Sequence, residues 1–169
     1  MRTAAFSLLS SVCLLMLACN TGTGEEQPTV PPAVQQDPTS GPQPPPEGAA
    51  VPRHDGVYQV AYAGTVQLMR FFPAGNVVTA TDYPAGADSL SRTLRVDLPA
   101  DLGKGIHNVP VTYRNDSVLF RTTIIRGYID YGGVLLPGDS LRLLKHSLAT
   151  AKRALLTYHF VPDNTGSAQ

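Results

Sequence analysis

The chain has 169 residues, which is room for one ordinary domain in addition to a targeting segment. Its 13 basic and 13 acidic side chains cancel, so no net field of the whole molecule favours a nucleic acid or an anionic membrane as partner. Both cysteines, Cys13 and Cys19, lie near the N-terminus, which excludes a disulfide framework or a cysteine-based metal site in the rest of the chain.

The N-terminal segment is typical of a signal peptide. Arg2 supplies one positive charge, and residues 4–18 form an uncharged, largely apolar stretch. As a helix this stretch would span roughly 22 Å, which is short of the ~30 Å hydrocarbon core of a bilayer. A signal peptide is therefore favoured over a permanent membrane helix.

The apolar stretch ends in Leu15-Met16-Leu17-Ala18-Cys19, which resembles the lipobox of bacterial lipoproteins. The resemblance implies that residues 1–18 are removed and that Cys19 carries acyl chains such as palmitate. Two or more acyl chains anchor a protein stably to a membrane. Asn20 stands where an aspartate would signal inner-membrane retention, so the outer membrane of the bacterial envelope is favoured. An ordinary cleaved secretory signal is the alternative.

Residues 19–53 predict a disordered tether. Nine prolines fall between Asn20 and Arg53 and bulky apolar residues are few, so little can offset the entropy of ordering. Such a segment would average about 30–35 Å from end to end as a coil and reach roughly 100 Å when fully extended. Residues 163–169 are likewise expected to form a disordered tail.

From residue 54 to residue 162 the sequence changes to short β-like runs separated by turn signals. Pro73-Ala74-Gly75-Asn76 predicts the clearest hairpin, since proline presets the entry of a turn and glycine supplies a positive φ. A further run covers residues 106–113, where Pro110 argues for a strand edge or a bulge. The other expected strands cover residues 56–62, 65–72, 77–81, 93–98, 118–124, 127–131 and 155–161.

Residues 140–155 are ambiguous. Leucines recur at helical spacing from Leu141 to Leu155, whereas Leu141 and Leu143 would share one face of a strand. We favour a strand, a loop and a second strand over a helix. The prediction is an all-β domain of seven or eight antiparallel strands, an up-and-down meander that closes into a small barrel because closure removes exposed strand edges.

Three short motifs of this domain are Gly56-Val57-Tyr58, the hairpin from Met69 to Val77, and the closing Tyr158-His159-Phe160-Val161-Pro162. Together they resemble the small lipocalin-like domains of bacterial lipoproteins. The chain has no Trp, so Tyr58 stands where lipocalins proper carry a tryptophan in their first strand. The resemblance implies an up-and-down barrel and suggests a small apolar or amphipathic ligand.

Arginine and aromatic residues supply the candidate ligand-binding positions. The guanidinium fork binds carboxylate and phosphate groups well, so Arg70 is a candidate for a ligand headgroup. Aromatic side chains can line a cavity with apolar walls and polar tips. The aromatic candidates are Tyr58, Tyr113, Phe120, Tyr128 and Tyr158. The alternatives are an outward-facing arginine and aromatic side chains that fill the core.

No motif in the sequence predicts catalysis, a cofactor or a metal site. Four histidines, His54, His107, His146 and His159, are scattered singly and are interpreted as surface residues. We therefore expect a non-catalytic lipoprotein that meets the membrane through its lipid anchor and binds a small hydrophobic or amphipathic ligand. The alternative is an envelope scaffold that recognises another envelope protein, since anchoring raises the local concentration of its surface.

Overall fold

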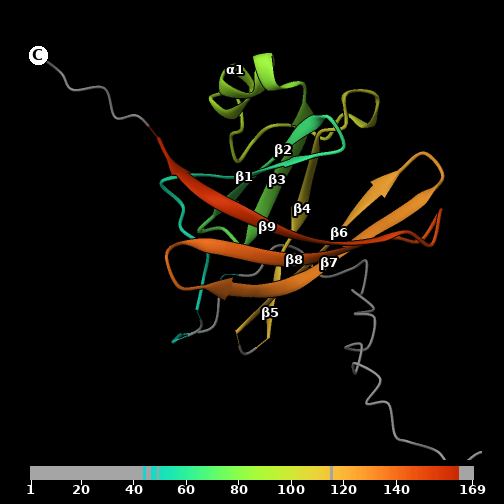
Figure 1. The fold of residues 1–169 in the computed structure, drawn as a ribbon. Coiled ribbons are helices and arrows are strands. Elements are labelled where there is room, and N and C mark those ends of the chain that lie inside the picture. Colours follow the sequence, from blue (N-terminus) through green and yellow to red (C-terminus); the bar gives the residue numbers. More distant parts are fainter. Residues whose placement is uncertain (1–43, 45–46, 49, 115, 164–169) are drawn as a thin grey trace, which may run out of the picture. The chain divides into compact units, whose positions relative to one another are not determined.

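The computed structural model describes residues 44, 47–48, 50–114 and 116–163 (Figure 1). The signal peptide predicted for residues 1–18, the acylated Cys19, most of the tether and the tail beyond Asp163 lie outside these residues and stay predictions. Within the part of the chain that is described, no helix has the length and hydropathy needed to cross a bilayer.

The domain is all-β, as the sequence predicts. The described residues form nine strands of one antiparallel sheet and one short helix, α1 (Ala87–Ser91). The strands are β1 (Gly56–Tyr62), β2 (Thr65–Phe72), β3 (Asn76–Asp82), β4 (His107–Pro110), β5 (Thr112–Arg114), β6 (Ser117–Ile124), β7 (Gly127–Leu136), β8 (Ser140–Ser147) and β9 (Arg153–Pro162).

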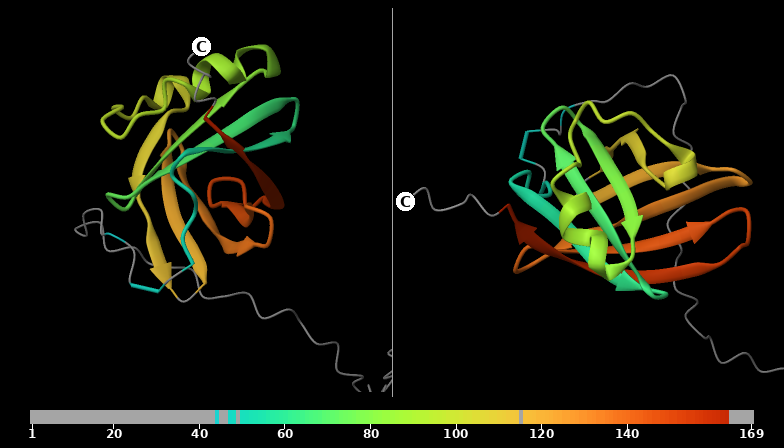
Figure 2. Two further views of the ribbon diagram at one scale, coloured as in Figure 1. Left: turned by 90° about the vertical axis from the view of Figure 1, so that its left-hand side faces the viewer. Right: turned by 90° about the horizontal axis from the view of Figure 1, so that it is seen from above.

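The strands follow one another around a nearly closed barrel (Figure 1, Figure 2). Their order in the sheet is β4-β3-β2-β1-β9-β8-β7-β6-β5. The first and last strands therefore lie side by side, with Tyr58 of β1 opposite Phe160 of β9. This pairing joins two series of hairpins, β1 to β4 and β5 to β9, into one sheet.

The prediction of seven or eight strands is wrong, partly because the run expected at 106–113 splits in two. β4 pairs with β3, β5 pairs with β6, and Val111 lies between them. The N–H of Val111 donates to the carbonyl oxygen of Gly75 at 2.9 Å. The interruption follows Pro110, which has no N–H to give to a strand ladder. The split strand leads the chain from one edge of the sheet to the other and brings the barrel close to closure.

The alternating run at 93–98 is not a strand. Leu94 is buried, at 2 % exposure, whereas Val96 is 47 % exposed. The side-chain amide of Asn108 donates to the carbonyl oxygens of Val96 and Leu98, both at 2.9 Å. A side chain thus binds backbone oxygens that a neighbouring strand would have bound. The alternation reflects a loop anchored by one leucine.

Two local predictions are confirmed. Residues 140–155 form β8, a turn and the start of β9, with Leu141 and Leu143 on the buried face of β8. The segment that begins at Pro73 is the turn between β2 and β3, and Gly75 adopts a φ of 86° there.

Apolar side chains form one cluster inside the barrel and a second on its outer face. The inner cluster is built from every strand except β4, which contributes the partly buried Val109 at its margin. The outer cluster contains Leu68, Val78 and Leu94, and α1 lies against β2 and β3 on that face (Figure 2). Both clusters lie within residues 51–160, so this segment contains the core that folds it.

The antiparallel order gives the barrel two distinct ends. At the stem end the chain enters at Arg53 and leaves at Asp163, beside the β7–β8 turn. At the turn end lie the β1–β2, β6–β7 and β8–β9 turns. These two ends differ in their chemistry.

Candidate functional site

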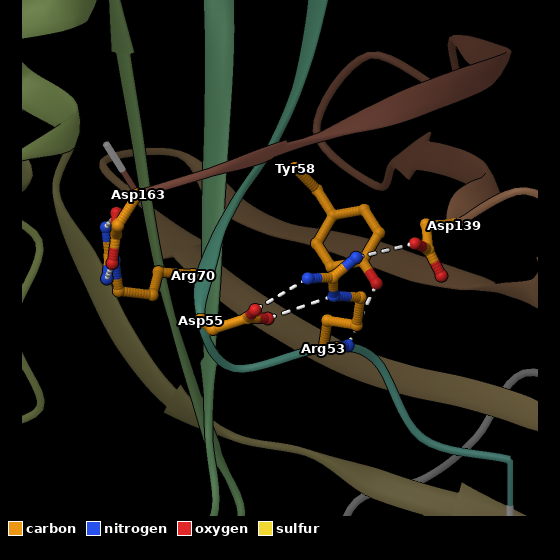
Figure 3. Close-up of polar contacts among 6 residues, drawn as sticks. All are labelled: Arg53, Asp55, Tyr58, Arg70, Asp139 and Asp163. Carbon is orange, nitrogen blue, oxygen red and sulfur yellow. Dashed lines mark hydrogen bonds and ion pairs between the residues drawn. The ribbon is translucent and has the colours of Figure 1, made fainter. Parts of the chain in front are cut away.

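Ion pairs fasten the stem end (Figure 3). Arg53 donates from Nε and Nη2 to Asp55 at 2.9 and 2.6 Å, and from Nη1 to Asp139 in the β7–β8 turn at 2.7 Å. Arg70 donates from Nη1 and Nη2 to Asp163 at 2.7 and 2.5 Å. These contacts hold the entering and leaving segments against the barrel, so the guanidinium groups of Arg53 and Arg70 are already paired with carboxylates.

Aromatic side chains pack the barrel interior. The Phe71 ring lies 5.7 Å from Tyr58 and 6.3 Å from Phe120 between centroids, and Phe120 stacks on Tyr131 at 4.6 Å. Tyr58 and Phe71 are fully buried. Burial also raises the pKa of Tyr113 to about 12. This region therefore serves as a packed core.

Lys145 reaches into the barrel at its turn end. It continues the inward-facing series of Leu141 and Leu143 along β8, and its register partner on β7 is Tyr131. Its Nζ lies 5.9 Å from the ring centroid of Tyr131 and 5.7 Å from that of Tyr62, the last residue of β1. Both distances fall within the ~6 Å range of cation–π attraction.

The charge of Lys145 has no carboxylate partner among the described residues. The side chain is half-buried, and burial lowers its pKa. His107, the first residue of β4, is half-buried too, and its pKa is lowered by burial and by the positive charge of Lys145. At neutral pH the imidazole is therefore an uncharged hydrogen-bonding group near a cation.

A buried hydrogen bond crosses the interior beneath this cation. The hydroxyl of Tyr158 donates to Oε1 of Gln67 at 2.9 Å and links β9 to β2. Burial raises the pKa of Tyr158, so the hydroxyl stays protonated. The hydroxyls of Tyr113 and Thr122 are also buried, without a hydrogen-bond partner among the described residues. Lys145 differs from these neutral groups because it carries a charge, and a buried charge costs more free energy than a buried hydroxyl when it is unpaired.

A half-buried cation with aromatic neighbours is suited to bind an anion. In low-dielectric surroundings an ammonium group gains more from a carboxylate or phosphate than it does in water. The neighbouring imidazole of His107 can accept or donate one further hydrogen bond. In the described part of the chain no group of three His, Cys, Asp or Glu side chains is arranged to hold a metal ion.

The structure separates the six residues that the sequence marked as ligand-binding. Four of them belong to the buried interior cluster: Tyr58, Tyr113, Phe120 and Tyr158. Arg70 lies on the outer face, where it binds Asp163 (Figure 3). Tyr128 also lies outside, with the guanidinium of Arg121 5.2 Å from its ring centroid. The predicted set is therefore mostly core, and it is not one site.

Comparison of the chain with protein-family models, with curated proteins and with solved structures gives no match.

Sequence reasoning missed Lys145 and His107. The signal for Lys145 is its place in β8, where it follows Leu141 and Leu143 at a spacing of two and so shares their inward face. The interpretation of His107 as a surface residue is corrected by its half-buried position on β4.

A hollow lies outside the barrel, between α1 and the outer face of β1 and β9. It has a volume of about 470 Å³ and is lined by Gln59, Asp88 and His159 among other residues. Nδ1 of His159 lies 3.4 Å from the Ser140 hydroxyl. As predicted, His159 is exposed. Apolar residues such as Val66 and Ala87 also line it, so the hollow is a candidate surface for a partner of mixed polarity.

Proposed function

We propose that this domain is a non-catalytic binding module for a small amphipathic ligand with an anionic headgroup. The headgroup lies against Lys145 at the turn end of the barrel, and the apolar part lies against the neighbouring barrel walls. The single observation that carries this proposal is a half-buried ammonium group without a carboxylate partner among the described residues. The nearly closed barrel and the resemblance to lipocalin-like domains support it.

An anionic ligand would supply the carboxylate or phosphate partner that Lys145 lacks among the described residues. A buried charge costs free energy unless it is paired, and hydrogen bonds to charged groups contribute about 1.5–3 kcal/mol. The walls next to Lys145 are suitable for an apolar chain, since Val60 and Ile129 are partly buried and Tyr62 is 39 % exposed. A bound carboxylate or phosphate would therefore meet a cation and apolar contacts at once.

The test is titration calorimetry with dodecanoate as ligand and dodecanol as the uncharged probe of equal length. We expect the full-length protein to bind dodecanoate and the Lys145→Met variant to bind it about 10- to 100-fold more weakly. Lys104→Met is the matched control, because Lys104 is exposed in the loop between α1 and β4, away from the turns around Lys145. Equal affinities for dodecanoate in the wild type and in Lys145→Met would refute the assignment of the headgroup site.

The second candidate function is recognition of another envelope component through the outer hollow. Its volume of about 470 Å³ and its lining residues Asp88 and His159 favour this alternative. Replacement of both residues by alanine would then abolish partner binding, whereas dodecanoate binding by the Lys145 site would persist. A loss of dodecanoate binding in this double variant would place the ligand in the outer hollow instead.

We also propose that the protein is anchored in the bacterial envelope through Cys19, as the lipobox-like sequence implies. Cells that express the full chain would incorporate a palmitate analogue into it, and the Cys19→Ser variant would not be labelled. Membrane fractionation would then distinguish the outer from the inner membrane. An unlabelled wild-type protein released in soluble form would favour an ordinary secretory signal.

A further inference from the structure

Two hairpin tips lie side by side at the turn end of the barrel (Figure 1). They are the β6–β7 turn and the β8–β9 turn. The N–H of Leu148 donates to the carbonyl oxygen of Tyr128 at 2.9 Å, which joins one tip to the other. A Cβ added at Gly127 would lie 3.7 Å from that of Ala149. The two tips therefore form one continuous surface.

This surface exposes large apolar side chains. Ile125 is 87 % exposed and Leu155 is 66 % exposed, while Tyr128 and Leu148 are each 45 % exposed. Single exposed apolar residues are ordinary on proteins, but a group on adjoining tips indicates an interaction site.

The same surface is positively charged. Arg126, Lys152 and Arg153 are exposed and form no ion pair within the described residues. Residues 123–129 and 144–155 contain no Asp or Glu. We refer to Ile125, Arg126, Leu148, Lys152, Arg153 and Leu155 as the basic rim.

The nearest acidic residues do not cancel this charge. Asp130 accepts hydrogen bonds from Nε and Nη2 of Arg121 at 2.5 and 3.0 Å, so its charge is already paired. Asp82 and Asp88 belong to the end of β3 and to α1, beyond the β1–β2 hairpin in the order of the sheet. The basic rim is therefore a local surface of one sign.

We propose that the basic rim docks on an anionic lipid surface. Exposed apolar tips that alternate with lysine and arginine are the composition that binds the interfacial layer of a membrane: the apolar groups enter the headgroup region and the cations pair with lipid phosphates. Each cation near such a surface strengthens binding about fivefold. The described chain enters and leaves the barrel at the stem end, so neither segment covers the rim.

This docking is distinct from the lipid anchor predicted at Cys19 and does not depend on the ligand site at Lys145. The rim residues lie outside the barrel, whereas Lys145 faces inward. The contact would turn the turn end of the barrel, where Lys145 lies, towards the lipid.

Vesicle sedimentation of the 20–169 fragment tests the proposal. This fragment lacks the acylated cysteine but keeps all nine strands and both apolar clusters. We expect it to bind vesicles of phosphatidylcholine and phosphatidylglycerol, and to bind vesicles of phosphatidylcholine alone at least tenfold more weakly. The variant Arg126→Gln/Lys152→Gln/Arg153→Gln would bind the anionic vesicles about a hundredfold more weakly than the wild type.

The matched control removes three exposed arginines from outside the rim: Arg92→Gln/Arg114→Gln/Arg142→Gln. It has the same net charge as the rim variant and should keep most of the binding. Equal losses in the two variants would mean that only total charge matters, and they would overturn the proposal. Failure of the wild-type fragment to bind anionic vesicles would overturn it as well.

A fluorescence measurement tests the apolar contact separately. The chain has no Trp, so Ile125→Trp introduces a single reporter at an exposed tip. Its emission should shift to the blue on addition of anionic vesicles. Val161→Trp, placed at the stem end where Val161 is 38 % exposed, should show no shift. An unchanged spectrum for Ile125→Trp would refute insertion of the rim.

Discussion

Replacement of Lys145 by methionine should stabilise the fold while it weakens ligand binding. Methionine has a similar length but no charge, so it removes the cost of holding an ammonium group partly out of water. That cost is several kcal/mol for full burial. It is reduced here because the side chain is half-buried and lies 5.7 and 5.9 Å from two aromatic rings, which return about 0.5–1 kcal/mol each at most. We expect the free energy of unfolding to rise by about 1 kcal/mol.

The pH dependence of this difference identifies its cause. Because burial lowers the pKa of Lys145 in the folded state, the unfolded chain binds more protons between the folded and unfolded pKa values. The penalty is complete below the folded pKa and disappears as pH rises towards the unfolded value near 10.4. The wild type should therefore approach Lys145→Met in stability at alkaline pH, with a slope of at most about 1.4 kcal/mol per pH unit.

Urea denaturation followed by circular dichroism between pH 7 and pH 10 measures both effects. Lys104→Met is again the control, and its stability should differ from that of the wild type by less than about 0.5 kcal/mol at every pH, because its side chain is exposed. Lys145→Met could instead lower the free energy of unfolding, or the difference between variant and wild type could stay constant with pH. Either result would show that the charge of Lys145 does not destabilise the fold by desolvation. The ligand-site argument would then lose its basis.

Three further perturbations test the framework around the site. A double-mutant cycle with Tyr158→Phe and Gln67→Leu should give a coupling of about 1 kcal/mol in urea denaturation, because each single change leaves one buried polar group unpaired; additive effects would contradict this. Asp163→Asn should cost about 0.5 kcal/mol at pH 7, discounted for the 47 % exposed carboxylate. The hydrogen bonds from Arg70 lower the pKa of Asp163, so its stabilisation is present above the unfolded pKa and should vanish as pH falls through the folded one. Gly133→Ala should lower the thermal midpoint sharply or prevent folding, since its Cβ would lie 1.9 Å from a carbonyl oxygen of β8; a variant of unchanged midpoint would contradict this packing.

Local signals in the sequence predicted the hairpins well. The turn at Pro73 and Gly75 is set by residues whose backbone preferences are intrinsic, and β8 and β9 are separated by a polar turn. Here the sequence alone is sufficient because the interactions that decide the structure are close in the chain.

The errors arose where a distant residue decides the structure. Leu94, Val96 and Leu98 alternate as a strand would, but Asn108 binds the carbonyl oxygens of this segment and Leu94 packs on the outer face of the sheet. The roles of the candidate site residues likewise depend on residues that are distant in the sequence. A tyrosine such as Tyr158 can fill a core or line a cavity, and only its packing against other strands decides between them.

The ligand site at Lys145 and the basic rim both lie at the turn end of the barrel, but they are separate proposals. Ion pairs and aromatic packing complete the stem end, whereas the turn end keeps an unpaired Lys145 inside and the basic rim outside. If the two act separately, Lys145→Met reduces dodecanoate binding and leaves vesicle binding unchanged, and the triple rim variant does the reverse. The basic rim could instead hold the turn end against the membrane so that dodecanoate passes directly from the lipid to the Lys145 site. In that case the rim variant should also take up dodecanoate from anionic vesicles more slowly, while its affinity for dodecanoate in solution stays unchanged. A rim variant that loses affinity in solution would instead place the headgroup on the rim, because only direct contact with the ligand changes the equilibrium in the absence of membrane.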